Sequence, residues 1–276
     1  MKGGYSEAAR HLSEQAYQIF REKGERNAVK VRRVMQITRN LSHGEFESLR
    51  ILDLGCGEGV YAIEAGIRGA QVVAIDARTQ RMANGIKIAD ELGLRNVRFM
   101  QQDVRAISKA TLGEFDVIYF LGLLYHLDAP DAFFVLGKVL DMCRDFVIID
   151  THTSLDGSTK VTHGNVDYFG VRYKEHDESD SLTTKSSRLL SSIDNVYSFW
   201  FTKDSLNRLL FETGFTTVLE CHVPFEPYKS NEAKNVQFPN DRVTLVATKG
   251  PPVKVSSYPW VNELAEEAIA QRLADK

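Results

Sequence analysis

The stretch ILDLGCGEGVYAIEAG, residues 51–66, places three glycines within five residues directly after a short apolar run. Glycine loses more backbone freedom on folding than any other residue, so such a cluster needs a physical reason. A strand that runs through a glycine-rich turn into a helix is where α/β sheets bind ligands, at the carboxyl end of the strand. The sequence therefore predicts that a ligand approaches the main chain at Gly55, Gly57 and Gly59.

From residue 49 onward, short β-branched or leucine-rich runs alternate with helical patterns. The patterns predict strands at 50–54, 71–75, 97–100, 116–121, 146–150, 217–222 and 243–248, and helices at 61–67, 79–92, 105–110, 129–143 and 205–213. Alternation of this kind implies βαβ units and a mainly parallel sheet. The expected fold is α/β, with a seven-stranded, mostly parallel, Rossmann-like sheet.

We expect three parts along the chain. Residues 1–48 carry two amphipathic helical patterns and form an N-terminal helical cap, and residues 49–250 form the α/β domain. Residues 251–276 form a C-terminal helical extension, whose apolar stripe fits docking, a homodimer contact or simple packing. Residues 151–195 are rich in Ser, Thr, Asp and His and are expected as a loop-rich insertion after the fifth strand.

Composition excludes several classes of protein. A chain of 276 residues is long enough to form a hydrophobic core without disulfides or a structural metal. Its net charge of -3 argues against a dedicated nucleic-acid binder. Cys56, Cys143 and Cys221 are too far apart in sequence to indicate a disulfide framework or a cysteine zinc site, and no metal site is expected. Without an apolar leader or a membrane-length apolar run, a cytoplasmic protein is expected.

Three motifs compete for the glycine loop. A P-loop requires GxxxxGK[ST], and neither Lys-Ser nor Lys-Thr follows here. A dinucleotide fingerprint requires GxGxxG, and Val60 occupies the third glycine position, which weakens a nicotinamide enzyme as an alternative. The third motif is that of class I S-adenosylmethionine (SAM)-dependent methyltransferases, which LDLGCGEG resembles: Asp53 ends the strand and GxGxG follows.

Two further acidic residues extend this resemblance. Asp76 ends the second predicted strand, nineteen residues after Gly57, where a carboxylate accepts hydrogen bonds from both ribose hydroxyls. Asp103 follows the third strand, where the family has an acid that accepts from the adenine amino group while Val104 supplies a main-chain N–H. The resemblance covers about residues 49–150 and, more weakly, 200–249. It implies SAM as cofactor and S-adenosylhomocysteine (SAH) as product.

The resemblance implies a cofactor site made of Tyr5, Asp53, Gly55, Cys56, Gly57, Asp76, Ala77, Gln102, Asp103, Val104, Leu121 and Tyr125. Asp53 carries the charge that suits the ammonium group of SAM, and Cys56 contributes its main chain. Tyr5 and the first helix are expected to close over the cofactor as a lid, unless that helix only covers the sheet.

Local phrases also resemble the tRNA wobble-uridine carboxymethyltransferase and its relatives: IDARTQRM, LGLLYHLDAP, NVYSFWFTKDSLNRLLFETGF and FPNDRVTLVATK. By that resemblance Tyr125 lies beside the transferable group and Arg242 reaches toward a carboxylate, which its planar fork pairs with bidentately. The counts of basic and acidic residues, 34 and 37, indicate no basic surface for tRNA. The resemblance therefore predicts a shared architecture rather than a shared substrate.

Methyl transfer needs orientation, exclusion of water and, for many acceptors, a base. The candidate bases are His126, after the fourth strand, and His152, after the fifth; a purely structural role is the alternative for each. Tyr125, Tyr168 and Arg242 are expected to face the acceptor, which insertion 151–195 roofs.

The sequence therefore predicts transfer of a methyl group to an oxygen or nitrogen of a small molecule. A tRNA-modifying methyl- or carboxymethyltransferase and a non-catalytic SAM-binding partner subunit are the alternatives.

Overall fold

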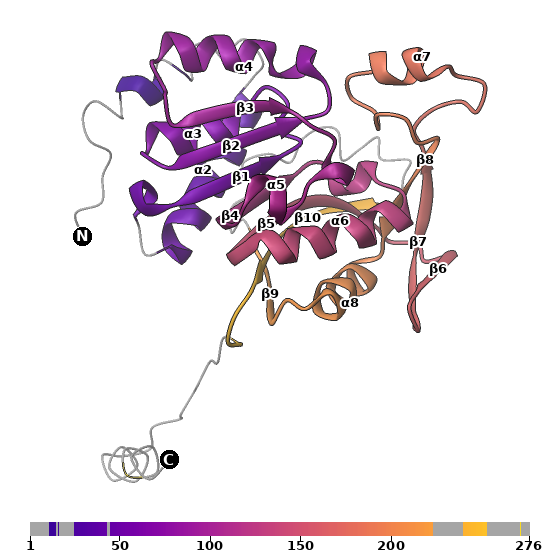
Figure 1. Cartoon of the computed structure of the whole chain (residues 1–276). Helices are drawn as coiled ribbons and strands as arrows, with labels where there is room; N and C mark the ends of the chain where they lie inside the picture. The colour runs from indigo at the N-terminus through magenta and orange to yellow at the C-terminus, as the bar shows by residue number, and fades with distance from the viewer. Residues whose placement is uncertain are drawn as a thin grey trace.

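The computed structural model describes residues 11–14, 16, 25–42, 45–222, 240–252 and 271. A seven-stranded sheet with the order β3-β2-β1-β4-β5-β10-β9 forms its centre (Figure 1). Strands β1 to β5 are parallel, and β10 lies antiparallel to both β5 and β9. The seven-stranded, mostly parallel sheet predicted from the sequence is confirmed.

The strands of this sheet are β1 (Arg50–Leu54), β2 (Gln71–Asp76), β3 (Val97–Gln101), β4 (Phe115–Leu121), β5 (Cys143–Ser154), β9 (Thr217–Glu220) and β10 (Asn240–Thr248). The helices around it are α2 (Glu25–Leu41), η2 (Phe46–Ser48), α3 (Val60–Ile67), α4 (Thr79–Glu91), η3 (Val104–Ala106), α5 (Lys109–Leu112), η4 (Leu124–His126), α6 (Ala129–Met142) and α8 (Lys203–Thr213).

Helices cover both faces of the sheet because each central strand is apolar on both sides. Ile51 and Val117 pack in one cluster with residues of α2 and α3. Leu52, Ile118 and Phe120 pack in the other cluster with residues of α6 and α8. Figure 1 shows α2 and α3 on the side of the sheet opposite α6. The core is therefore divided into two layers by the sheet.

Several elements of the sheet domain differ in their bounds from the predicted ones, and two of these differences have a clear physical cause. The helix predicted at 105–110 is split into η3 and α5, because Asp103 and Ser108 each cap a separate short helix by accepting a main-chain N–H. Strand β5 continues to Ser154 rather than ending at residue 150, because β10 pairs with it along that whole length.

The insertion contains more regular structure than its polar composition indicates. Strands β6 (Thr159–His163), β7 (Val166–Lys174) and β8 (Tyr197–Phe201) form an antiparallel sheet beside the main one, and α7 (Leu182–Ser187) lies on an arm between β7 and β8 (Figure 1). The polar residues of β6 and β7 are largely exposed, whereas Tyr168, Phe199 and Phe201 are buried. The sequence of a sheet with only one buried face contains many polar residues. This composition explains why loops were expected in residues 151–195.

Several predictions fall outside the described residues. These are Tyr5, most of the first helix, and the C-terminal extension at 251–276 apart from residues 251, 252 and 271. The boundaries at 48, 250 and 151–195 remain predictions. Among the helices that the structure describes, none has the length and apolarity needed to cross a bilayer.

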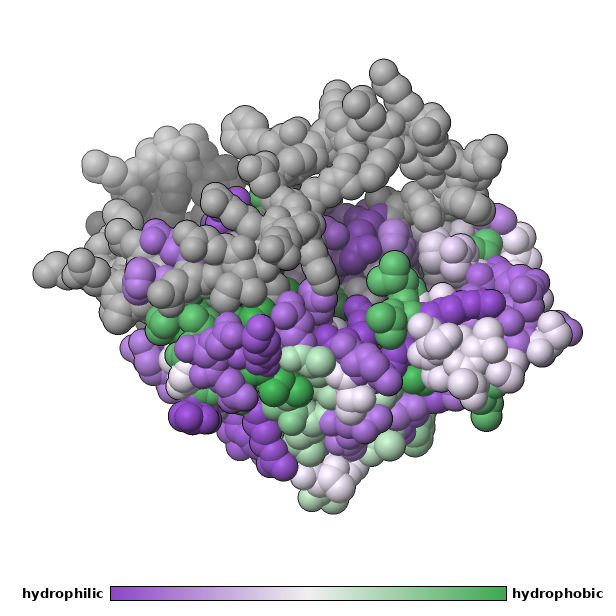
Figure 2. Space-filling model, turned by 90° about the horizontal axis from the view of Figure 1, so that it is seen from above, coloured by the Kyte–Doolittle hydropathy of each residue, from purple (hydrophilic) through white to green (hydrophobic). Residues whose placement is uncertain are grey.

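Seen from above, hydrophobic residues lie in small groups among hydrophilic ones over the described part of the surface (Figure 2). Scattered apolar residues of this kind are normal on a protein surface and indicate no partner by themselves.

Candidate functional site

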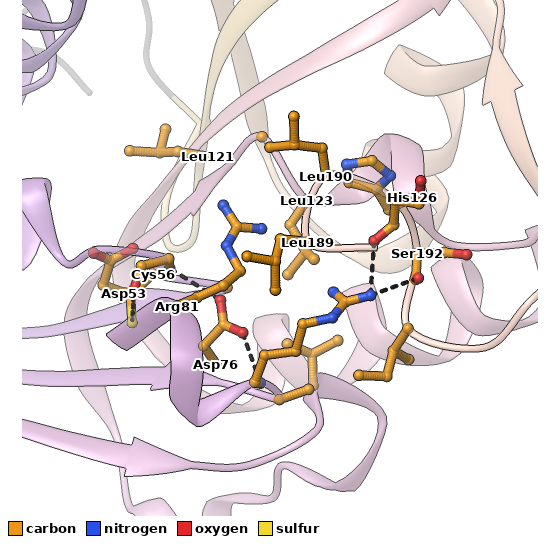
Figure 3. A pocket seen from close by; sticks show the side chains of 18 of the residues that line it. Asp53, Cys56, Asp76, Arg81, Leu121, Leu123, His126, Leu189, Leu190 and Ser192 are labelled. Atoms are coloured by element: carbon orange, nitrogen blue, oxygen red, sulfur yellow. Dashed lines mark hydrogen bonds between the residues drawn. The ribbon is translucent and has the colours of Figure 1, made fainter. Parts of the chain in front are cut away.

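A cavity of about 730 Å³ opens where the parallel strands end (Figure 3). The register aligns those ends, since Leu54 pairs with Ile75 and Asp76 pairs with Gln101. Its walls are the glycine loop, the turns after β2, β3 and β4, residue Val31 of α2, and residues 189–193 and 195 beyond α7. The predicted ligand site and part of the insertion therefore enclose one space.

The glycine loop adopts a backbone that few other residues tolerate. Gly57 has φ +55° and Gly59 has φ +73°, both in the left-handed region. A Cβ on Gly57 would lie 2.9 Å from Nη2 of Arg81, whose side chain reaches into the cavity (Figure 3). A Cβ on Gly59 would lie 2.4 Å from Cε1 of Phe99 in β3. Gly57 thus faces the cavity, whereas packing inside the protein accounts for Gly59.

Asp53 is a buried carboxylate near the carboxyl end of β1. Its Oδ2 has no hydrogen-bond partner among the described residues. Burial raises the pKa of Asp53 to about 7, the hydrogen bond from the Ala62 main chain opposes this, and the charge of Asp76 adds to it. A cationic group entering the cavity would satisfy this oxygen and favour the ionised form.

Asp76 is held by two main-chain donors. Its Oδ2 accepts from the N–H of Gly57 at 3.0 Å and its Oδ1 accepts from the N–H of Arg78 at 2.9 Å. These bonds fix the carboxylate between the glycine loop and the turn after β2 (Figure 3). Each carboxylate oxygen keeps further acceptor capacity, so Asp76 can also accept from ligand hydroxyls.

Asp103 lines the cavity in an ion pair with Arg105. Nη2 of Arg105 lies 2.6 Å from Oδ2 of Asp103 and 2.8 Å from Oδ2 of Asp194. Although burial acts to raise it, the hydrogen bonds and charge of Arg105 lower the pKa of Asp103. Val104 and Ala77 also line the cavity, whereas Gln102 does not, and its side chain donates to the carbonyl of Ala106.

Arg78, in the turn after β2, binds the main chain of residues 186–192. We call residues 186–195, which include the part of the insertion that lines the cavity, the roof of the cavity. Nε and Nη2 of Arg78 lie within 3.2 Å of four main-chain carbonyl oxygens, those of Ser186, Arg188, Ser191 and Ser192. The Arg78 residue is only 8% exposed, so these bonds are shielded from water. Sequence reasoning missed this contact, since no local signal joins residues more than 100 positions apart.

Cys56 lies in the cavity wall with a buried thiol (Figure 3). Burial, with the charges of Asp53 and Asp76, raises the pKa of this thiol above its ordinary value. The thiol stays protonated at neutral pH and is not poised as a nucleophile.

His126 lines the cavity from η4, and its Nδ1 lies 2.8 Å from Oε1 of Glu175. Tyr125 and Leu121 line the same side. The Tyr125 carbonyl accepts from Nε1 of Trp200 at 2.9 Å, which anchors η4 to β8.

His152 lies behind Tyr125 rather than in the cavity wall. Its ring stacks on Trp200 with centroids 5.0 Å apart, and its Nε2 lies 3.1 Å from Nη1 of Arg242. Burial lowers the pKa of His152 to about 4, and the charge of Arg242 acts in the same direction. His152 is therefore neutral at neutral pH, and its Nε2 accepts from Arg242.

The other two predicted acceptor residues also lie outside the cavity wall. Arg242 pairs with Asp150, and its Cζ lies 5.6 Å from the Tyr125 ring centroid. Tyr168 is buried against Phe133. The structure brings Arg242 to the edge of the site and leaves Tyr168 in the core.

The cavity also includes residues that sequence reasoning missed. They are Val31, Glu58, Val60, Tyr61, Arg78, Gln80, Arg81, Arg105, Gly122, Leu123, Leu127, Leu189, Leu190, Ser191, Ser192, Ile193 and Asn195. The Leu189–Leu190 pair inside a polar segment was an available signal. Within the described ranges, no three His, Cys, Asp or Glu side chains are grouped as metal ligands.

Comparison with known proteins agrees with this geometry. Residues 51–145 match the family model of a methyltransferase domain. Residues 51–145 are thus similar to a methyltransferase domain, and the sheet order and the cavity at the strand ends agree with the class I fold that the sequence predicts.

The similar curated proteins include the ubiquinone biosynthesis O-methyltransferases of Acinetobacter baumannii (strain AYE), 29% identical over 104 residues, and of Psychrobacter cryohalolentis, 30% identical over 95 residues. These matches cover 38% and 34% of this chain, and 41% and 35% of the relatives. The chain thus spans about two fifths or less of the length of the curated relatives it matches.

Two solved structures share the fold. The N-terminal domain of EvdMO1, studied with SAH and D-fucose, superposes with a TM-score of 0.61 at 18% identity and covers 90% of this chain and 99% of that one. Magnesium protoporphyrin IX methyltransferase from Synechocystis PCC 6803 with bound SAM has a TM-score of 0.52 at 15% identity, covering 90% and 86%.

Proposed function

We propose that this protein is a SAM-dependent methyltransferase that acts on a hydroxyl group of a small molecule. The observation that carries the proposal is the cavity at the strand ends, which is lined by Asp53, whose Oδ2 has no hydrogen-bond partner among the described residues, and by the fixed carboxylate of Asp76. Oxygen is favoured over nitrogen as the methylated atom because the curated relatives are O-methyltransferases.

The donor groups of the cavity fit SAM. Asp53 offers a carboxylate to the ammonium group, and the Gly57 backbone allows close approach of the ligand. Asp76 offers acceptors for the ribose hydroxyls, while Asp103 and Val104, which also line the cavity, would hold the adenine ring. When bound, SAM supplies an electrophilic methyl group on a sulfonium. The surrounding residues orient it and exclude water.

The acceptor would enter beside Tyr125 and His126, under residues 189–195. This part of the cavity is lined by Leu123, Leu127 and Leu190, which suits an organic molecule. His126 is the better candidate base, because it lines the cavity, whereas the Nε2 of His152 already accepts from Arg242. The base would take the hydroxyl proton as the acceptor oxygen bonds to the methyl carbon, while the carbon–sulfur bond of SAM breaks and SAH leaves.

Calorimetry with SAH tests the cofactor assignment. The wild-type protein is expected to bind SAH, and Asp76→Ala to weaken binding by about 1–3 kcal/mol through loss of a charged acceptor. Asp90→Ala is the matched control, since Asp90 is an exposed carboxylate on α4. Equal affinity of Asp76→Ala and the control would remove the ribose assignment.

The same preparation distinguishes the alternatives. Co-purified RNA, or binding of tRNA, would favour a tRNA-modifying enzyme. Tight SAH binding without turnover on a broad panel of small acceptors would favour a SAM-binding partner subunit.

A further inference from the structure

We propose that Glu175, at the end of β7, is a positioning residue that makes Nε2 of His126 the basic atom of the site. This inference rests on the proposed function. His126 belongs to the sheet domain, and Glu175, 49 positions further along the chain, belongs to the insertion. Nothing in the local sequence joins them.

The first step is the geometry of the carboxylate. Oε1 of Glu175 lies 2.8 Å from Nδ1 of His126, and Oε2 accepts from the main-chain N–H of Ser192 at 3.0 Å. The Glu175 side chain is 2% exposed, so both interactions are shielded from water. A carboxylate accepts at both oxygens, and therefore Nδ1 of His126 carries a proton that it donates to Glu175.

The second step is the consequence for the ring. A neutral imidazole with its proton on Nδ1 has its lone pair on Nε2. No hydrogen bond joins Nε2 to any residue that the structure describes, and the His126 side chain is 16% exposed at the cavity. Nε2 is thus available to take a proton from a bound hydroxyl, while Nδ1–H and Glu175 hold the ring in place.

The third step is the charge around the pair. Glu175, directly after β7, is hydrogen-bonded to the His126 ring, Tyr125 from the same turn contacts it with ring centroids 4.3 Å apart, and the charge of His126 acts on His152 of β5. Arg78, from the turn after β2, acts electrostatically on Glu175. A negative charge on Glu175 would stabilise the imidazolium that forms when Nε2 takes a proton, because opposite charges attract strongly where water is excluded.

A glutamine would not replace this glutamate. Both partners, Nδ1–H of His126 and N–H of Ser192, are donors, and an amide has one acceptor oxygen and one donor nitrogen. In Glu175→Gln, one of the two bonds is therefore lost. Because Ser192 is also bound by Arg78, the bond to His126 is the one expected to break.

The test is nitrogen NMR of the imidazole of His126 in the full chain at pH 8, assigned by the signals missing from His126→Gln. In wild type we expect the proton on Nδ1, and in Glu175→Gln a shift of population toward the tautomer protonated on Nε2. Glu178→Gln, an exposed carboxylate three residues along, is the control and should match wild type. A wild-type His126 protonated on Nε2 overturns the inference, and this result needs only the assignment variant His126→Gln to fold.

Chemical modification gives a second readout. Diethyl pyrocarbonate reacts with the free lone pair of an imidazole, so modification of His126 should be several-fold slower in Glu175→Gln than in Glu178→Gln. Equal rates would contradict the assignment. SAH affinity measured on the same variants keeps the two proposals apart. If the wild-type protein does not bind SAH, the proposed function is wrong. If Glu175→Gln has the same His126 tautomer as wild type, only the role of Glu175 is wrong.

Discussion

The imidazole of His152 and the indole of Trp200 lie stacked, with their centroids 5.0 Å apart and their planes at 12°. Tyr173 also stacks on Trp200, with the ring centroids 4.4 Å apart and the ring planes at 13°. The stack joins β5, β7 and β8, and it buries His152 in the neutral form. This contact gives the insertion a fixed place beside the cavity.

The buried neutral His152 makes stability depend on pH. Its pKa is about 4 in the folded protein and 6.5 ordinarily, so the unfolded chain binds the extra proton between these values. Stability is therefore lost as pH falls from about 6.5 toward 4. Between pH 7 and pH 5, wild type should lose about 1 kcal/mol more than His152→Gln in urea unfolding, since His152 is half-buried and solvent screens part of the effect. An identical loss in both proteins would contradict the neutral, buried ring.

Asp53 should act in the opposite sense. Its pKa is about 7 in the folded protein against 3.8 ordinarily, so the folded state binds the extra proton between these values. Stability then falls as pH rises from about 4 to 7. From pH 5 to pH 8, urea unfolding should show wild type losing about 2.5 kcal/mol more than Asp53→Asn. A pH dependence shared by both proteins would mean that Asp53 is ionised like an exposed carboxylate.

Arg78 should hold the roof of the cavity in place. In Arg78→Lys the charge stays, but a single ammonium cannot reach the carbonyls that the guanidinium collects from 186–192. Hydrogen–deuterium exchange is expected to become faster in residues 186–195 and unchanged in β1. Arg98→Lys, at an exposed position of β3, is the matched control. Unchanged protection of 186–195 would show that other contacts carry the roof.

Gly59 and Gly93 separate backbone strain from packing. Both have left-handed φ angles, +73° and +66°, but a Cβ would meet Phe99 at Gly59 and nothing within 4 Å at Gly93. Gly93→Ala should cost about 1 kcal/mol, from the backbone alone, and Gly59→Ala at least about 2 kcal/mol. Urea unfolding measures both, and equal costs would contradict the close packing of Phe99 on the glycine loop.

The fold was predictable because its signals are local. Each central strand is a short apolar run, and the acidic residues Asp53 and Asp76 mark where β1 and β2 end. Parallel strands bring these ends to one edge, so the main features of the cofactor site follow from the order of the motifs.

The roof and the base were less predictable because their contacts are distant in sequence. His126 was identified as a candidate, but its partner Glu175 sits in a polar segment with no pattern that marks it. Strands β6 to β8 have one buried face and carry Ser, Thr and Asp on the other, so composition alone indicated loops. Tyr168 was expected to face the acceptor because it is an aromatic residue in the insertion, but its side chain is buried in the core.

A crystal structure of the protein grown with SAH tests the central claim most directly. We expect SAH in the cavity at the ends of β1 to β4, with its ammonium group beside Asp53 and its ribose hydroxyls on Asp76. SAH bound at another place, or with its sugar away from Asp76, would contradict the account.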